Sequence, residues 1–314
     1  MSRAAGPALG GAALLGVAAA PWLLSSYSVG LLTQALIYAI FAMSLDLLLG
    51  YTGLPSLGHA AYFGVAAYTL GLLALRAGLS FWAALPWALA AAAGVGALFA
   101  LLAVRARGAY FLMITLALGQ VLWGTAFRWR SLTGGEDGIS GLPRPALRAW
   151  APPAGPAGYH LFVLAVFLVA ALALAILVRS PFGLALKGIR ASESRMEALG
   201  YNVWLYKYLA FVLAAALAGL AGTLFGAYTG FVSPADLSIV TSARALLMVI
   251  LGGAGTLAGP AVGAGAILLL ESWVSTQLER WLSVLGAVYI LVVVFCPHGL
   301  VRLFRPARGG RAAA

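Results

Sequence analysis

The sequence predicts an all-α integral membrane protein, a polytopic bundle of about ten transmembrane helices with short or re-entrant glycine-broken segments. Of the 314 residues, 63% are hydrophobic and only 9% are charged, whereas an ordinary soluble domain has about 25% charged residues. The mean hydropathy is +1.01. So few charges could not cover a soluble protein of this size, which excludes a cytoplasmic globular enzyme and a disordered tail. Long apolar runs beside the basic residues also argue against a nucleic-acid partner, despite the net charge of +11.

Stretches without Asp, Glu, Lys or Arg delimit the expected helices, since about 20 mostly apolar residues cross a bilayer. The stretch 4–45 is long enough for two helices, and Pro21 with the polar run 25–28 predicts a break inside it. The stretch 245–270 contains three glycines within 252–255, which favours two short helices or a re-entrant pair. The expected segments are 8–24, 29–49, 60–75, 79–104, 108–127, 159–178, 205–230, 237–252, 259–275 and 281–297.

The distribution of basic residues predicts the orientation. An even number of crossings places both termini on one side, and twelve of the 19 Lys and Arg residues then fall on that side, against six on the other. The positive-inside rule makes the first side cytoplasmic. The chain 1–314 is therefore expected to form one transmembrane domain, with a cytoplasmic loop at 179–207, a periplasmic loop at 128–158 and a basic cytoplasmic tail at 302–314.

The cytoplasmic loop 179–207 differs in kind from the other loops. Its stretch 184–200 alternates apolar with charged residues of both signs and predicts a pair of amphipathic helices. Ser194 with Glu197 fits a capping box, and Gly200 with Asn202 fits a helix stop. Such helices could lie in the lipid headgroups or dock a cytoplasmic protein. The mixed charges favour a protein partner, because anionic lipid prefers uniform Lys and Arg.

Several kinds of site are missing from the sequence. The only lysines, Lys187 and Lys207, do not follow a Walker A glycine loop, so the chain is not expected to hydrolyse ATP. The single cysteine, Cys296, allows no internal disulfide, and the histidines lie too far apart for metal-ligand spacing, so no metal site is expected. No chain of carboxylates or histidines runs through the helix centres, which argues against proton coupling.

Small residues recur at every fourth position in two stretches, where helices could approach closely. We assign a helix-packing role to five of them, either within the subunit or at a subunit interface. The two stripes are Ala218–Gly222–Gly226–Gly230 and Gly255–Gly259–Gly263, and the five are Gly222, Gly226, Gly230, Gly259 and Gly263.

Six strings, in order along the chain, are similar to motifs of one family. They are LGYTGLPSLGHAAYFG at 49–64, RGAYFLMITLA at 107–117, TGGEDGI at 133–139, SPFG to EALG at 180–200, LGGAGTLAGP at 251–260 and PHGL at 297–300. Together they resemble the LivM-type membrane permeases of high-affinity branched-chain amino-acid ABC importers. Asp46, Arg244 and His298 depart from the pattern of that family.

The resemblance implies an assembly in the bacterial inner membrane. A homologous LivH-like permease would share the translocation path, two cytoplasmic ABC ATPase subunits would carry ATP and Mg, and a periplasmic or surface binding protein would deliver substrate. The chain itself would be non-catalytic and hold no cofactor. It also implies that the 180–200 string couples to the ATPases through Ser192, Glu193, Arg195, Glu197, Ala198 and Gly200.

Irregular backbone at membrane depth survives only beside protein or a water-filled cavity, so the glycine-broken segments 50–58 and 252–259 are expected to line the path. The expected path residues are Thr52, Gly53, Ser56, His59, Thr115, Gln120, Gly252, Gly253 and Gly255. For His59, packing in the core is the stronger interpretation.

Three alternatives remain open from the sequence. An ABC permease for urea or short amides shares much of the same signature, and Asp137 favours amino acids over it. An ion-coupled secondary transporter would need no ATPase partner. A membrane-embedded enzyme would need a polar cluster at one interface, which the sequence does not show.

Overall fold

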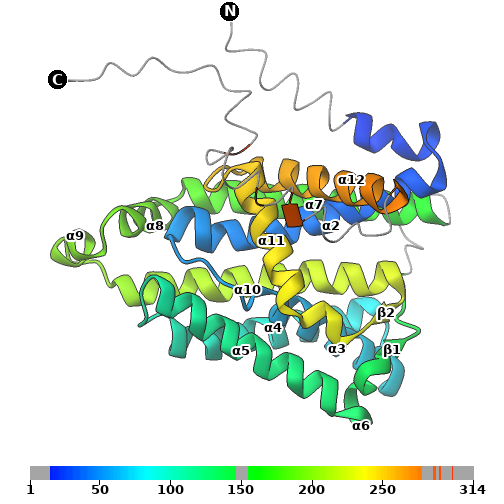
Figure 1. The fold of residues 1–314 in the computed structure, drawn as a ribbon, viewed down its shortest axis with the longest axis horizontal. Helices are drawn as coiled ribbons and strands as arrows, with labels where there is room; N and C mark the ends of the chain where they lie inside the picture. Colours follow the sequence, from blue (N-terminus) through cyan, green and yellow to red (C-terminus); the bar gives the residue numbers. More distant parts are fainter. Residues whose placement is uncertain (1–14, 146–154, 278–285, 288–289, 291–298, 300–314) are drawn as a thin grey trace, which may run out of the picture.

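The computed structural model describes residues 15–145, 155–277, 286–287, 290 and 299. Helices dominate it, and most lie along the long axis of the molecule (Figure 1). The elements are a helix over 15–23, α2 (Ser26–Asp46), the π-helix η1 (Leu47–Thr52), α3 (His59–Arg76), α4 (Phe81–Ala103), α5 (Ala109–Arg128), α6 (Arg130–Thr133), η2 (Gly135–Asp137), β1 (Ile139–Ser140), α7 (Pro156–Arg179), α8 (Pro181–Ala191), α9 (Glu193–Ala198), α10 (Val203–Thr229), β2 (Phe231–Val232), η3 (Pro234–Leu237), α11 (Ile239–Gly252) and α12 (Gly259–Gln277).

Two helices form the centre of the bundle. The α2–η1 segment is 72% buried and α10 is 61% buried, whereas α5 is only 22% buried. α10 packs on α2, α3 and α4, and α2 also packs on α7, α11 and α12. Where α2, α3 and α10 meet, the aromatic rings of Tyr38, Phe41, Phe63 and Phe225 pack against one another. The exposed apolar faces therefore belong to the peripheral helices, as expected for surfaces that face lipid.

Five helices in the described residues are long and apolar enough to cross a membrane: Ser26–Thr52, Phe81–Ala103, Ala109–Arg128, Pro156–Arg179 and Val203–Thr229. The multi-pass, all-α class is therefore confirmed, but the expected count of about ten crossings is not. The expected segments at 60–75, 237–252 and 259–275 do coincide with the helices α3, α11 and α12, which are shorter or less apolar. The segment 281–297 and the tail 302–314 lie mostly or wholly outside the described residues.

Serine side chains start several helices. Ser25, Ser80 and Ser238 each accept a hydrogen bond from a backbone N–H three residues later, which satisfies one of the open donors of the first turn. The expected break inside 4–45 is present, but it lies at 24–25 and Pro21 stays within the helix 15–23. The expected break between 252 and 259 separates α11 from α12.

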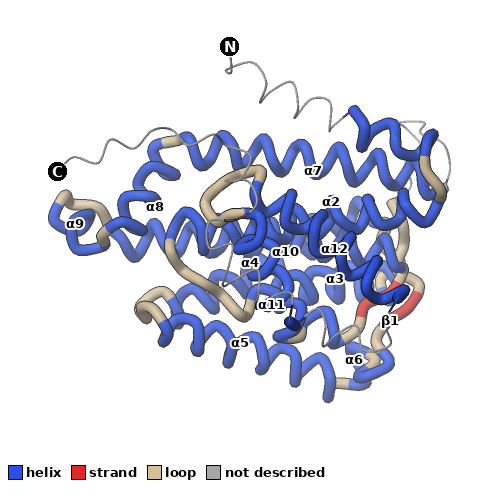
Figure 2. The backbone as a smooth tube through the Cα atoms, turned by 45° about the horizontal axis from the view of Figure 1, so that its top comes forward, coloured by secondary structure: helices blue, strands red, loops and turns tan. Residues whose placement is uncertain are grey.

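The two ends of the bundle differ. α8 and α9 lie at one end, and the antiparallel pair β1–β2, with Ile139 opposite Val232, lies at the other (Figure 2). α11 runs obliquely between the group that contains α2 and α12 and the group that contains α3 (Figure 1). The α8–α9 pair therefore forms a separate projection from the bundle.

The small residues bring helices into close approach within the subunit. A Cβ on Gly222 would overlap the Phe63 carbonyl of α3, and one on Gly263 would overlap the Met248 carbonyl of α11. Gly226 lies beside the Leu142 side chain, and Gly259 lies against the carbonyls of 252 and 253.

Two members of the expected stripes are not within helices. Gly230 ends α10 with φ at +68° and borders open space, and Gly255 lies in the loop 253–258 with φ at +80°. Their spacing in sequence was misleading, because α10 ends just before Gly230 and α12 begins only after Gly255. They permit a left-handed turn, which only glycine adopts readily.

The substitution Gly222→Ala is expected to lower the free energy of unfolding by about 1–3 kcal/mol, because the added methyl group meets backbone that cannot move aside. The matched control is Gly94→Ala on α4, where an added Cβ meets nothing within 4 Å and helix propensity favours alanine by about 1 kcal/mol. Thermal unfolding in detergent measures both. Similar melting temperatures for the two variants would contradict the close approach of α10 and α3.

Candidate functional site

The two glycine-broken segments meet at the end of α2. The backbone N–H of Gly255 donates to Asp46 Oδ1 at 2.8 Å, although the two residues are 209 positions apart. Gly50 lies between them, and a Cβ there would overlap both the Asp46 carboxylate and the Gly255 nitrogen. Only glycine therefore lets the π-helix pass this contact. π-helical turns are rare and frequently occur at functional sites.

Residues of α8 complete this contact. Arg190 donates from Nη1 to the Gly50 carbonyl, and the stem of its side chain lies beside Gly53. Lys187 lies over the Tyr51 ring, 5.4 Å from its centroid. We call Asp46, Gly50, Arg190 and Gly255 the Asp46 junction. The junction joins the predicted cytoplasmic loop to both of the glycine-broken segments.

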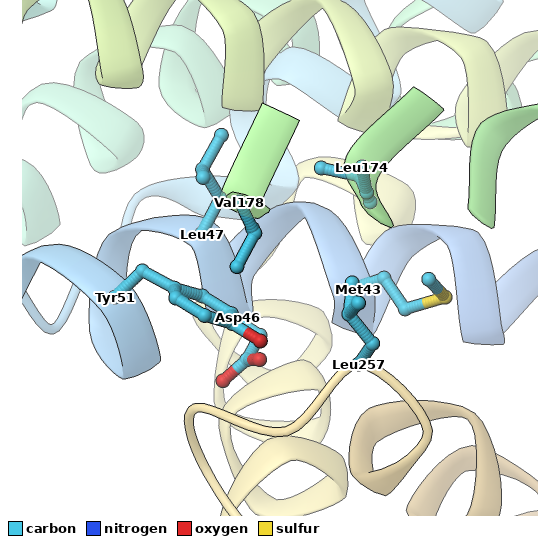
Figure 3. A pocket seen from close by; sticks show the side chains of 7 residues that line it. All are labelled: Met43, Asp46, Leu47, Tyr51, Leu174, Val178 and Leu257. Atoms are coloured by element: carbon cyan, nitrogen blue, oxygen red, sulfur yellow. The ribbon is translucent and has the colours of Figure 1, made fainter. Parts of the chain in front are cut away.

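A small cavity borders the junction. It has a volume of about 10 Å³, room for about one water molecule, and lies between α2–η1, α7 and the loop that carries Leu257. Asp46 and Tyr51 point to the same side of α2, toward that loop, and the rest of the lining is apolar (Figure 3). The cavity is too small for an amino acid, so this end of the bundle is closed in the structure.

Of the expected path residues between 52 and 59, Thr52, Ser56 and His59 are buried and Gly53 is exposed. Thr52 Oγ1 donates to the Leu47 carbonyl at 2.9 Å. Ser44 Oγ donates to the Phe41 carbonyl and lies 2.8 Å from His59 Nε2. His59 therefore carries its proton on Nε2, and its buried Nδ1 has no partner among the described residues, as is also true of Ser56 Oγ. The packing interpretation of His59 agrees with its position.

α5 packs against the loop that contains Leu57 and Gly58. Thr115 Oγ1 accepts from the Leu57 N–H at 3.3 Å, and Gly58 lies so close that a Cβ would overlap the Thr115 carbonyl. Gln120 is different: it lines an open cleft of about 810 Å³ on α5, together with Trp123 and Trp129. The structure thus brings Thr52, Gly53, Ser56, His59 and Thr115 together and leaves Gln120 apart. Gly255 belongs to the Asp46 junction, and Gly252 and Gly253 precede it at the end of α11.

The predicted helix pair is present as α8 and α9, but its ends differ from the expectation. Ser192, not Ser194, is the N-cap of α9 and accepts from the Arg195 N–H. Asn202 does not stop a helix; its side chain caps the start of α10 by accepting from the Leu205 N–H. Several residues in this stretch can cap a helix, and the three-dimensional path of the backbone determines which of them do so.

Charged residues of α9 are divided between internal and exposed roles. Glu193 pairs with Lys207, whose side chain is 3% exposed, and with Arg107 at 3.2 Å. Arg107 also lies 3.8 Å from Glu197. The pairs tie α9 to the start of α10 and to the loop before α5.

The remaining surface of α9 is open. Arg195, Glu197, Ala198 and Gly200 are exposed, and Leu199 is 68% exposed beside them. We call Arg195, Glu197, Ala198, Leu199 and Gly200 the α9 face.

The sequence prediction missed the residues that organise the junction. Asp46 was noted as a departure without a role, and Arg190 was placed in the amphipathic stretch without a partner. Charge near a helix end was the available signal, but the partners lie up to 209 residues away and no local spacing indicates them.

Comparison with protein-family models matches residues 27–295 to the family described as branched-chain amino acid transport system / permease component. The chain is 34% identical to the high-affinity branched-chain amino acid transport system permease protein LivM of Escherichia coli K12, over 94% of this chain and 75% of that protein. It is 26% identical to LivH of the same organism, over 84% and 91%. It is also 26% identical to the guanosine ABC transporter permease protein NupQ of Bacillus subtilis, over 55% and 59%. No solved structure matches.

Replacing Asp46 by Ala is expected to lower the free energy of unfolding by about 1–3 kcal/mol, since the Gly255 N–H loses its acceptor in a buried place. Asp46→Asn keeps a side-chain oxygen there and should remain within about 1 kcal/mol of the parent. The melting temperatures of the purified proteins in detergent measure the difference. An equal loss in both variants would mean that the charge, and not the accepted hydrogen bond, holds the junction.

Proposed function

Since the chain belongs to the family of branched-chain amino acid transport system permease components, we propose that it is the membrane-spanning permease subunit of an ATP-driven importer for branched-chain amino acids. The observation that carries the mechanism is the Asp46 junction. Arg190 of α8 binds the Gly50 carbonyl, and Asp46 binds the Gly255 N–H, so the junction links α8 to both glycine-broken segments. A displacement of α8 and α9 by a cytoplasmic partner would therefore be transmitted to the segments that border the path.

The α9 face is the surface on which a partner ATPase would dock. It is exposed, it carries both charge signs and Leu199, and Glu193 behind it is tied to the buried Lys207. One of two cytoplasmic ABC ATPases would bind here, and the other would bind a LivH-like permease. ATP and Mg would belong to the ATPases, and this chain would be non-catalytic.

The orientation follows from the same proposal. If ATPases bind α9, the α8–α9 end faces the cytoplasm, together with both chain termini, and the β1–β2 end faces the binding protein. The excess of basic residues on the α8–α9 side supports it, because cytoplasmic loops retain positive charge. The membrane is then the bacterial inner membrane.

Transport would proceed by alternating access. The structure is closed at the Asp46 junction, where the cavity among the described residues has a volume of only about 10 Å³. Closure of the ATPases on ATP would move α8 and α9, and Arg190 would carry the movement to Gly50 and to the 253–258 loop. Irregular segments can absorb such a change of backbone angles, as few-residue hinges do. Thr52, Ser56, Thr115 and the flanking glycines would then border the opened path.

The test of this function is ATP-driven uptake. The chain with its LivH-like partner, two ATPases and the binding protein is reconstituted in liposomes, and leucine uptake is measured with and without internal ATP. We expect uptake only with ATP, competition by isoleucine and valine, and none by urea. Competition by urea or acetamide would favour the amide permease, and uptake driven by an ion gradient without ATPases would favour a secondary transporter.

Leu199→Asp is expected to remove the ATPases from the purified complex, because it places a desolvated charge at the centre of the α9 face. Co-purification of the ATPase subunits is the measurement. Glu136→Lys, a charge change on an exposed residue of the 128–158 loop, is the matched control and should retain them. Full retention of ATPases by Leu199→Asp would refute docking on α9.

A further inference from the structure

A second charged group lies inside the bundle, toward the β1–β2 end and away from the Asp46 junction. Arg244 of α11 forms an ion pair with Glu271 of α12. Its Nη1 also donates to Tyr38 Oη at 3.3 Å, and its guanidinium lies 4.8 Å from the Tyr38 ring centroid. Ionisable groups among membrane helices are costly and usually mark a function. Neither the junction nor the α9 face uses this group.

The ion pair borders a cleft. The cleft has a volume of about 400 Å³ and lies between the first half of α2, the end of α10 and the second half of α12. Gln34, Ser272 and Ser275 add uncharged polar groups to its wall, whereas Leu31 and Leu268 add apolar surface. The side chains of Arg244 and Glu271 remain 27% and 12% exposed. An amide, hydroxyls and both charge signs thus converge on a space large enough for a small molecule.

The cleft continues toward the loop 128–158. A neighbouring cleft of about 290 Å³ shares Ser26, Gly30 and Tyr228 with it and reaches Arg144. Arg144 donates to the Tyr228 carbonyl at 3.2 Å. A small molecule with a carboxylate that enters from the β1–β2 end would therefore meet Arg144 first and Arg244 second.

We propose that this cleft binds the zwitterionic head of a free α-amino acid, with its carboxylate at Arg244 and its ammonium at Glu271. Guanidinium has five N–H donors, and hydrogen bonds to Glu271 and Tyr38 account for two nitrogens of Arg244 among the described residues. Its third nitrogen, Nε, is buried without a partner there. Arg presents a planar fork that suits a carboxylate.

The wall of the cleft also suits an aliphatic substituent. Leu31 and Leu268 line it on the α2 and α12 sides, so a branched side chain would leave water while the charged head stays between the two ionised groups. A neutral amide such as urea offers neither an ammonium to Glu271 nor a carboxylate to Arg244. The site thus deepens the proposed function, on which it rests, by placing a selective contact within the permease.

The experiment measures protection of an engineered cysteine in the reconstituted complex. Ser275, which lines the cleft, and Thr276, which does not, are exposed neighbours on α12. Each is replaced by Cys in a Cys296→Ser background and modified with a charged methanethiosulfonate reagent. Leucine at about ten times its half-protecting concentration should slow modification of Ser275→Cys about tenfold and leave Thr276→Cys unchanged.

Two leucine analogues test the recognition of both charges. Isocaproate lacks the ammonium and isopentylamine lacks the carboxylate, so neither should protect Ser275→Cys at that concentration. Adding Arg244→Gln or Glu271→Gln should remove protection by leucine, with melting temperatures recorded to identify a variant that has merely lost its fold. The cysteine variants keep the ion pair and so test the site without disturbing it.

The proposal is overturned if leucine does not protect Ser275→Cys, if either analogue protects it equally, if both cysteines slow together, or if Ser275→Cys does not react at all. Leucine protection in Arg244→Gln with an unchanged melting temperature would also overturn it. Failure of the proposed function is measured separately, as absence of ATP-driven leucine uptake by the Cys296→Ser parent. Protection of the cleft can be measured whether or not that uptake is observed.

Discussion

The hydrogen bond from the Gly255 N–H to Asp46 holds together parts of the chain that lie 209 residues apart. It can form only because residue 50 is glycine, since any Cβ would occupy the same space. Arg190 then binds the carbonyl of that same residue. The positions of the π-helix, the 253–258 loop and α8 are therefore set by one another.

The rest of the bundle is built to stay rigid. α10 approaches α3 so closely at Gly222 that backbone touches backbone, and α12 does the same to α11 at Gly263. Close-packed interiors tolerate few continuous deformations. In the proposed mechanism, the segments that lack regular helix, 53–58 and 253–258, absorb the movement of the path.

The sequence predicted helices better than their ends or their partners. Charge-free runs and glycine breaks located α2 to α12 within a few residues, because membrane helices need a known apolar length. Ser192 and Asn202 were misread because several residues in 192–202 can cap a helix, and only the path of the chain selects among them. Gly230 and Gly255 matched a helical spacing although they lie just outside the helices, Gly230 after α10 and Gly255 before α12. Gln120 shares a helix with Thr115 but lies beside a different cleft.

The sequence by itself determined that this chain is a multi-pass membrane protein without an ATPase motif, and that its 180–200 segment differs from the other loops. These properties are local, since they depend on composition, on apolar length and on motif spacing. The tertiary structure alone decided that Arg190 reaches Gly50, that Glu193 faces Lys207, and that Arg244 meets Glu271. Those pairs join separate helices, and the crossing of helices that brings them together depends on packing of the whole bundle, which no stretch of sequence contains.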